Sequence, residues 1–288
     1  MTHVTISNNS ASESGGMRLF NSNPILTHVT ISNNTAEYAG GGMRLSNSNP
    51  VLTNVTIANN TAGIYGGGGM YLNNSNPTMT GVTFSGNTSD RNGGGIYLSS
   101  SSMNGNYLLV HNNYSEGHGG GIFISAISNI SLNNSTIASN MTGEGDTFGA
   151  GIYADGGTAT LINNIVYYNR REGDYGINYN LNGYTMDILD EYTVSYSDIE
   201  GDENWIPEGE GNISIAPEVH DFENGDFTLK STSPCIDAGT ADINGDGYDD
   251  IMDYYGSAPD MGAFEYYVGD DCNLGDVNCD DILNVLDV

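Results

Sequence analysis

The sequence predicts an all-β fold, a parallel β-helix of about seven to eight coils followed by an irregular acidic cap. A Gly-Gly-apolar signal recurs every 26 to 30 residues, with its apolar residue at Met17, Met43, Met70, Ile96, Ile122 and Ile152. An apolar-Thr-apolar signal recurs every 25 to 29 residues, centred on Ile6, Ile31, Ile57, Phe84, Val110, Ile137 and Val166. Two interleaved signals that share one period indicate a repeat in which every unit adds one coil.

Each repeat unit contains two or three short strands. Segments 42–45, 51–53 and 55–57 alternate between apolar and polar residues or are short β-branched runs, which is typical of strands. The intervening Asn-Ser-Asn-Pro and Asn-Asn-Thr-Ala sequences form turns. No window has helical periodicity, and the leucine ladder of a leucine-rich repeat is absent. A unit of this length with tight bends is therefore one coil of a parallel β-helix.

An asparagine follows each strand centre of the second signal by three residues, at Asn9, Asn34, Asn60, Asn87, Asn113, Asn140 and Asn169. Asparagine tolerates the left-handed backbone of a sharp corner, and identical amides stacked on one another form hydrogen bonds from coil to coil. We therefore predict one amide column along the helix. The alternative interpretation is that sequons such as Asn8-Asn9-Ser10 mark glycosylation.

The charge excludes several classes of function. The 288 residues carry 36 acidic and 6 basic side chains, a formal net charge of −30. Such a surface repels phosphate backbones and anionic lipids, so we expect no nucleic-acid partner. No apolar run is long enough to span a membrane. Residues 170–288 hold 29 of the 36 acids, which predicts a different kind of structure after the repeat.

One outward position of the repeat carries cations and aromatic rings. The residue between the two inward apolar residues of each Gly-Gly strand faces solvent, and in successive coils it is Arg18, Arg44, Tyr71, Tyr97, Phe123 and Tyr153. Such a column stacks against sugar rings, with the arginines meeting carboxylates. This predicts a face that binds an acidic glycan. The alternative is that the rings only stabilise the sheet by cross-strand packing.

Catalytic chemistry has a weaker signal. A polysaccharide lyase needs a Lys or Arg base with cations that neutralise the sugar carboxylate, and a glycosidase needs converging carboxylates. The repeat shows neither arrangement, so we assign no catalytic residue. The best acid–base or metal candidate is segment 111–118, with His111, Tyr114, Glu116 and His118 around one turn. A solvated loop between two coils is the alternative interpretation.

The Gly-Gly-Gly-Met and Val-Thr-Ile-Ser-Asn-Asn motifs resemble the repeats of extracellular right-handed parallel β-helix proteins of bacteria, over about residues 1–200. That group includes pectate-lyase-like enzymes and polymorphic outer-membrane adhesins. The resemblance implies a right-handed helix and export, and it leaves lyase, hydrolase and binding functions open. The motifs YSDIEG, GDFTL, SPCIDAG and DMGAFEY resemble the C-terminal region of choice-of-anchor proteins. In those proteins the region closes the β-helix and precedes a surface-attachment module.

Segment 242–253 has the ligand spacing of an EF-hand-like Ca²⁺ loop. Oxygen ligands occupy positions 1, 3, 5, 9 and 12, Gly247 stands at position 6, and a carbonyl serves position 7; the ligands are Asp242, Asn244, Asp246, Tyr248, Asp250 and Asp253. Aspartate replaces the usual bidentate glutamate at position 12, which indicates weaker binding. The alternative is an acidic surface turn.

A second such loop lies near the C-terminus, with ligands at Asp276, Asn278, Asp280, Asn284 and Asp287. It resembles the first half of a type I dockerin repeat, which implies a cohesin-like or surface-anchor partner. Asp281 stands where that family has glycine, so we expect weak Ca²⁺ binding. Cys272 and Cys279 are close enough in sequence for a small disulfide, whereas Cys235 is expected to be a buried thiol.

These observations predict a secreted or cell-surface monomer, organised as a β-helix over 1–200, a capping region with a Ca²⁺ loop over 201–268 and a truncated dockerin-like segment over 269–288. Both flanks are expected to be missing. The preferred function is binding of a polysaccharide or surface glycan, and the expected cofactor is Ca²⁺. The alternatives are a polysaccharide lyase or glycoside hydrolase whose catalytic coils lie partly outside the chain, and a purely structural stalk.

Overall fold

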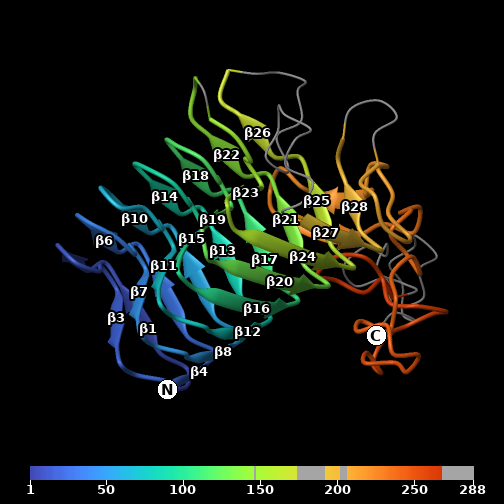
Figure 1. Cartoon of the computed structure of the whole chain (residues 1–288), viewed down its shortest axis with the longest axis horizontal. Coiled ribbons are helices and arrows are strands. Elements are labelled where there is room, and N and C mark those ends of the chain that lie inside the picture. Colours follow the sequence, from blue (N-terminus) through green and yellow to red (C-terminus); the bar gives the residue numbers. More distant parts are fainter. Residues whose placement is uncertain (146, 174–191, 202–205, 268–288) are drawn as a thin grey trace, which may run out of the picture.

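The computed structural model describes residues 1–145, 147–173, 192–201 and 206–267, which form strands, turns and loops without a helix. The strands stack coil upon coil along the molecule, and four parallel sheets run the length of the stack (Figure 1). This is a parallel β-helix, as the repeat predicts. The described residues contain no helix that is long and apolar enough to cross a membrane.

Each coil contributes one strand to each sheet, so a coil has four strands and not two or three. In chain order within a coil, the first sheet contains β1 (Thr5–Ser7), β5 (Thr30–Ser32), β9 (Thr56–Ala58), β13 (Thr83–Ser85), β17 (Leu109–His111), β21 (Thr136–Ala138), β25 (Ile165–Tyr167) and β28 (Asp198–Ile199). The second sheet contains β2 (Ser10–Ala11), β6 (Thr35–Ala36), β10 (Thr61–Ala62), β14 (Thr88–Ser89), β18 (Tyr114–Ser115), β22 (Met141–Thr142) and β26 (Arg170–Arg171).

The third sheet contains β3 (Met17–Phe20), β7 (Met43–Ser46), β11 (Met70–Asn73), β15 (Ile96–Ser99), β19 (Ile122–Ser125) and β23 (Ile152–Asp155). The fourth sheet contains β4 (Ile25–Thr27), β8 (Val51–Thr53), β12 (Thr78–Thr80), β16 (Ser102–Asn106), β20 (Asn129–Asn133), β24 (Thr158–Ile162) and β27 (Tyr192–Ser195). Within the described residues, six coils supply all four sheets and β25 to β28 continue the stack, which is slightly fewer complete coils than predicted.

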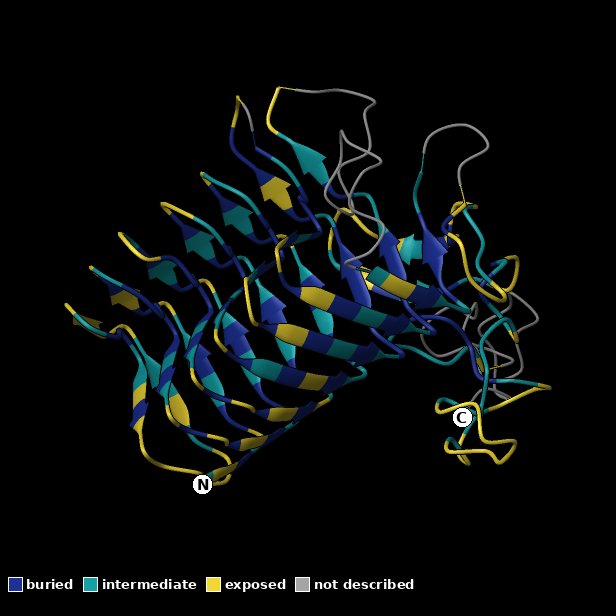
Figure 2. Ribbon diagram, viewed as in Figure 1, coloured by how far each residue is buried: buried dark blue, intermediate teal, exposed yellow. Residues whose placement is uncertain are grey.

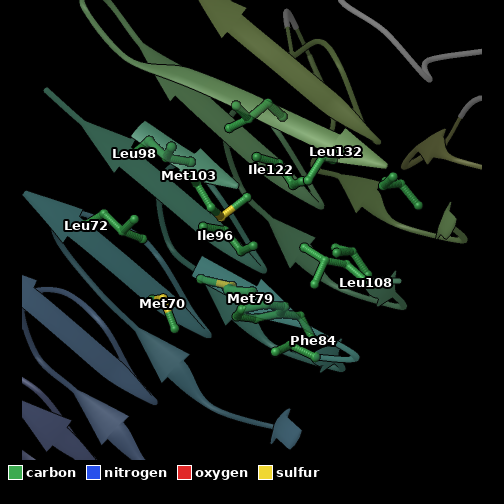
Figure 3. Close-up of a cluster of buried hydrophobic side chains, with 14 of the residues drawn as sticks. Met70, Leu72, Met79, Phe84, Ile96, Leu98, Met103, Leu108, Ile122 and Leu132 are labelled. Atoms are coloured by element: carbon green, nitrogen blue, oxygen red, sulfur yellow. The ribbon is translucent and has the colours of Figure 1, made fainter. Parts of the chain in front are cut away.

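The core lies inside the prism and consists of stacked apolar columns. Alternate residues of each strand point inward, so Met70 lies over Met43 and Leu72 over Leu45, all completely buried. Figure 3 shows these columns in the middle coils, with Phe84, Met79 and Leu108 filling the space between the sheets. Burial decreases toward the first coil, where yellow and teal segments replace dark blue (Figure 2).

The predicted amide column is confirmed. Each side-chain Nδ2 from Asn9 to Asn140 donates to the side-chain Oδ1 of the asparagine one coil further on, at 2.9 to 3.0 Å. The column ends at Asn169. The next amide oxygen also accepts a backbone N–H, as between Asn60 and Asn87 at 3.0 Å. The predicted left-handed backbone is wrong for these asparagines, because the preceding residue, such as Asn33 or Asn59, takes the positive φ.

Glycine is required at the corner before the third sheet. Gly40 has a φ of +67°, a left-handed backbone that glycine adopts without strain. Gly42 is needed for a different reason, because a Cβ there would lie 2.6 Å from the carbonyl oxygen of Gly69 in the next coil. The close approach of the two coils at this corner leaves no room for a side chain.

A second internal ladder was not recognised in the sequence. The Asn-Ser-Asn-Pro turns were interpreted only as turn formers, but Ser48 and Ser75 of these turns are buried, as are Ser101 and Ser128 at the same corner of later coils. The hydroxyls of Ser48, Ser75, Ser101 and Ser128 each accept the backbone N–H of the corresponding residue in the preceding coil, at 3.0 to 3.2 Å. Two polar ladders therefore satisfy backbone donors at two different corners of the prism.

The sequence predicted that the C-terminal region caps the open end of the β-helix. In the structure this region packs mainly against the side of the β-helix. We call residues 217–267 the lateral segment; it includes the antiparallel pair β29 (Val219–Asp221) and β30 (Asp226–Leu229). Phe227, Leu229, Cys235 and Met261 form a second apolar cluster with Ala138 and Ile165 of the first sheet. Figure 1 shows this orange segment beside β25 and β28.

The outward positions of the first sheet explain this placement. They carry threonine from β1 to β13, at Thr5, Thr30, Thr56 and Thr83, but Leu109 in β17 and Ile165 in β25. Because apolar side chains gain by leaving water, the later coils have an outer surface that the lateral segment covers. The residues just before the lateral segment do cover the exposed edge of the last coil. Ile213 exchanges backbone hydrogen bonds with Ser197 and Ile199 at the edge of β28.

A buried carboxylate joins the lateral segment to the last coil. Asp198 of β28 is completely buried, and its Oδ1 accepts the N–H of Ile215 at 3.1 Å. The thiol of Cys235 donates to its Oδ2 at 3.4 Å. Burial raises the pKa of Asp198 to about 7. Cys235 is a free, buried thiol, as predicted.

Candidate functional site

The outward column of the third sheet has the predicted register. Arg18, Arg44, Tyr71, Tyr97, Phe123 and Tyr153 are successive Cα partners in the parallel ladder. We call these six residues the outward column. Stacked parallel strands place equivalent side chains one coil apart, so the order of the rings follows directly from the repeat.

The rings of the outward column stack on one another. The centroids of Tyr71 and Tyr97 are 5.0 Å apart, those of Tyr97 and Phe123 are 4.7 Å apart, and the planes lie within about 20° of parallel. Tyr153 continues the stack 5.6 Å from Phe123. The guanidinium of Arg44 lies over the ring of Tyr71 at 5.7 Å, a cation–π contact.

Phe123 differs from the expectation. It holds its place in the outward column, but only 2% of it is exposed, so it offers no face to a ligand. Its neighbours Tyr97 and Tyr153 stack against its two faces. The tyrosines on either side are half-buried and keep accessible edges. Burial raises the pKa of the Tyr97 phenol, with further contributions from Tyr71 and Asp155, so this hydroxyl is a neutral donor and acceptor.

The two arginines of the column share one carboxylate that the sequence did not single out. Glu13 Oε2 lies 2.6 Å from Arg44 Nη1 and 3.5 Å from Arg18 Nη2. Half of the Arg18 side chain is exposed, against 21% of Arg44. Glu13 precedes the glycine corner of the first coil, and only the coil stacking brings it to Arg44, which is 31 residues away.

A row of small polar residues accompanies the rings. The second outward position of the third sheet is Ser46, Asn73 and Ser99 in β7, β11 and β15, with Ser125 and Asp155 further on. These side chains are half-buried or exposed. The face therefore combines the edges of apolar rings with hydroxyl and amide groups, and a sugar ring makes contacts of both kinds.

The structure divides the 111–118 candidate between two surfaces. His111 lies on the first sheet, where its ring meets Phe227 of the lateral segment edge to face at 5.3 Å. His118 lies beyond β18, next to the outward column. Tyr114 donates its hydroxyl to Glu172 at 3.0 Å, and burial with this hydrogen bond raises its pKa. The four residues do not form one acid–base or metal site.

His118 instead belongs to a hollow that the sequence did not reveal. The loops that follow β14 and β18 form a shallow, open hollow of about 370 Å³, lined by Asp90, Arg91, Asn92, Glu116, Gly117 and His118. We call it the 90–118 hollow. The hollow places Arg91 with the two carboxylates of Asp90 and Glu116. The sequence singled out Glu116 and His118 but not Asp90, Arg91 or Asn92, because these lie on a corner loop where the repeat tolerates any polar residue.

The 242–253 loop is exposed and held by its own side chains. Asp242 accepts the N–H groups of Gly245 and Gly247 at 2.7 and 2.8 Å, and Asp250 Oδ2 accepts that of Asn244 at 3.1 Å. Asp253 lies apart and lines a second hollow with Tyr107 and Glu265. Among the described residues, no three His, Cys, Asp or Glu side chains are grouped to hold a metal ion. Calcium binding here stays a prediction.

The second predicted Ca²⁺ loop, at Asp276, Asn278, Asp280, Asn284 and Asp287, lies outside the described residues. The same holds for Cys272, Cys279 and the dockerin-like segment 269–288. These predictions therefore stay open.

Four parallel sheets with in-register columns define the protein as a parallel β-solenoid. The chain belongs to the right-handed β-helix family, because the family model described as "Right handed beta helix region" matches residues 1–104 and 66–191. Among solved structures, the crystal structure of pectate lyase Pel9A is similar at a TM-score of 0.48 and 16% sequence identity, over 91% of this chain and 70% of that chain. No curated protein matches the sequence.

Proposed function

We propose that the protein binds an acidic polysaccharide or surface glycan along the outer face of its third sheet. The observation that carries this proposal is the outward column, a continuous stack of rings with two arginines at one end. A polysaccharide in extended conformation matches a surface that repeats with every coil. The accessible edges and hydroxyls of Tyr71, Tyr97 and Tyr153 contact the sugars, while Arg18 and Arg44 attract their carboxylates.

Rigidity supports the same proposal. The amide column and the serine ladder hold successive coils in register, so the binding face is formed before the ligand arrives. A preformed face costs little conformational entropy when it binds. The scarcity of lysine fits this design, because few flexible side chains need to be ordered on the face.

The test compares two tyrosine substitutions on a panel of polysaccharides that includes polygalacturonate and alginate. Tyr97→Ala removes the central ring, and we expect it to weaken binding about tenfold. Tyr248→Ala removes a 78% exposed ring outside the face and is the matched control. Both variants are also melted, because Tyr97 packs against two rings and its loss also lowers stability. Wild-type affinity in a folded Tyr97→Ala protein would leave the rings with a packing role only.

A specific observation also favours the second candidate, a polysaccharide lyase or glycoside hydrolase. The 90–118 hollow gathers Arg91 with the carboxylates of Asp90 and Glu116, which are the residue types of a lyase base or of a hydrolase acid–base pair. The absorbance of unsaturated uronate and a reducing-sugar assay distinguish the two reactions. Turnover that is lost in Glu116→Gln and kept in Glu37→Gln would establish an enzyme.

Export to the cell surface is part of the proposal. It is supported by the family's extracellular resemblance and by the order of the four C-terminal motifs that resemble choice-of-anchor proteins. A dockerin-like attachment through segment 269–288 is proposed on the same ground. Protease added to intact producing cells should remove the protein, whereas a cytoplasmic marker should persist.

A further inference from the structure

The 90–118 hollow lies beside the stacked rings, on the loops that lead into β15 and β19. His118 stacks on Tyr153 with centroids 4.5 Å apart and planes 15° from parallel, and Tyr153 belongs to the outward column. Arg91 acts electrostatically on Tyr97 of the same column. A glycan bound along the column therefore reaches the hollow without leaving the protein surface. Its volume of about 370 Å³ lies at the lower end of the range of small-molecule sites, about 300 to 1,000 Å³.

His118 is held in one orientation. Its ring lies between Tyr153 and Phe148, whose ring is 5.6 Å away and nearly parallel. Its Nδ1 accepts the backbone N–H of Phe148 at 3.0 Å. Its own backbone N–H donates to Asn92 Oδ1 at 2.9 Å. Rotation of the imidazole would therefore break the hydrogen bond between Nδ1 and the Phe148 N–H and the two ring contacts.

The protonation of His118 follows from these contacts. Burial lowers its pKa, against an opposing effect of Asp155, so the ring is neutral near pH 7. The Nδ1 lone pair is already used by Phe148, so the proton of the neutral ring is on Nε2. A neutral imidazole with a fixed Nε2–H is a hydrogen-bond donor, and it carries no charge that would require a counter-ion.

The other lining groups supply complementary chemistry. Within the described residues, the Arg91 guanidinium makes no ion pair or hydrogen bond, whereas Arg44 is paired with Glu13. The exposed carboxylates of Asp90 and Glu116 are acceptors only. Two carboxylates beside one guanidinium give the hollow a net negative charge, which disfavours an anionic group. The donor and acceptor set fits vicinal hydroxyl groups.

We propose that the 90–118 hollow binds one uncharged sugar unit, with Asp90 and Glu116 accepting its hydroxyls and Arg91 and His118 Nε2 donating to it. This inference rests on the proposed function, and it makes the ligand a polymer that carries neutral sugars beside its acidic ones. The arginine end of the outward column takes the acidic units. The hollow, about four coils away, takes the neutral unit.

The experiment measures monosaccharide binding by ligand-observed NMR and calorimetry, with galactose, glucose, mannose and xylose as probes. Glu116→Gln keeps the shape of the side chain and removes its charge, and we expect at least a tenfold weaker interaction with the sugar that binds best. Glu37→Gln is the matched control, because Glu37 follows β6 as Glu116 follows β18, three coils away. A His118→Gln variant should lose the same sugar.

The outcomes separate this inference from the proposed function. Sugar binding that is lost in Glu116→Gln and retained in Glu37→Gln and Tyr97→Ala supports the hollow, even if no acidic polymer binds. Polymer binding that depends on Tyr97, with no monosaccharide bound at millimolar concentration, overturns the hollow and keeps the face. Equal binding of the sugar by wild type and Glu116→Gln also overturns it.

Discussion

Glu13 Oε2 lies 2.6 Å from Arg44 Nη1 and holds the guanidinium that would otherwise be free to meet an acidic sugar. The same oxygen lies 3.5 Å from Arg18, so one carboxylate competes with the ligand at both cations of the outward column. Because both partners are accessible to solvent, the pair is weak and a polyanion displaces Glu13 easily.

Removal of this competition should strengthen binding. We expect Glu13→Gln to bind polygalacturonate several-fold more tightly than wild type, and the gain should shrink as NaCl is raised from 50 to 300 mM. Titration calorimetry measures both effects. Glu223→Gln, which removes one exposed charge from the lateral segment, corrects for net charge. An equal gain in affinity in both variants would show that Arg18 and Arg44 do not contact the ligand.

The amide column should be the most sensitive polar element of the β-helix. Asn87 accepts two N–H groups from Asn60 and donates to Asn113 and to the Ile57 carbonyl. Asn87→Ala leaves these buried partners unsatisfied, and we expect a loss of about 3 kcal/mol in the free energy of unfolding. Chemical denaturation measures it. Asn49→Ala, in an exposed turn, should cost less than about 1 kcal/mol, and similar losses in both would contradict the ranking.

Asp198 should make stability depend on pH. Its folded pKa of about 7 lies above the ordinary value of 3.8, so the protonated carboxyl favours the folded state. This contribution is complete below pH 3.8, falls as the pH rises and is lost above pH 7, a change of about 4 kcal/mol. Asp198→Asn should abolish it. Urea midpoints at pH 4.5 to 7.5 give the difference between the two proteins, and parallel curves would refute the assignment.

The lateral segment should detach separately from the β-helix. Phe227, which is 2% exposed, packs against His111, and Phe227→Ala removes this anchor at a cost of about 3 kcal/mol. Hydrogen exchange should then accelerate over residues 217–267 but not in the amide column. Met252→Ala, at an 83% exposed position of the same segment, should change neither. Uniform acceleration over all coils would show instead one cooperative unit.

The calcium prediction has a control within its own loop. We expect EDTA to lower the melting temperature and added Ca²⁺ to restore it, because an ion that binds only the folded state stabilises it. Asp246→Ala should remove this response, whereas Asp249→Ala, at a position outside the ligand spacing, should retain it. An unchanged melting temperature in EDTA would remove Ca²⁺ from the description of segment 242–253.

The repeat by itself determines the fold and the composition of the outward column. Equivalent residues one period apart become neighbours when coils stack, so Tyr71 and Tyr97 meet because of their spacing. The same argument predicted the amide column from Asn9 to Asn169. The sequence could not predict which residue takes the left-handed backbone, because Asn33 and Asn34 have the same side chain. Only the geometry of the corner distinguishes them.

Features that join different periods were decided only by the tertiary structure. The pairing of Glu13 with Arg44 and the contact of Cys235 with Asp198 join positions that are not equivalent in the repeat. A period specifies contacts between equivalent positions, whereas corner loops and the lateral segment find partners by shape and burial. The burial of Phe123 belongs to the same group, since its accessibility depends on the side chains that stack above and below it.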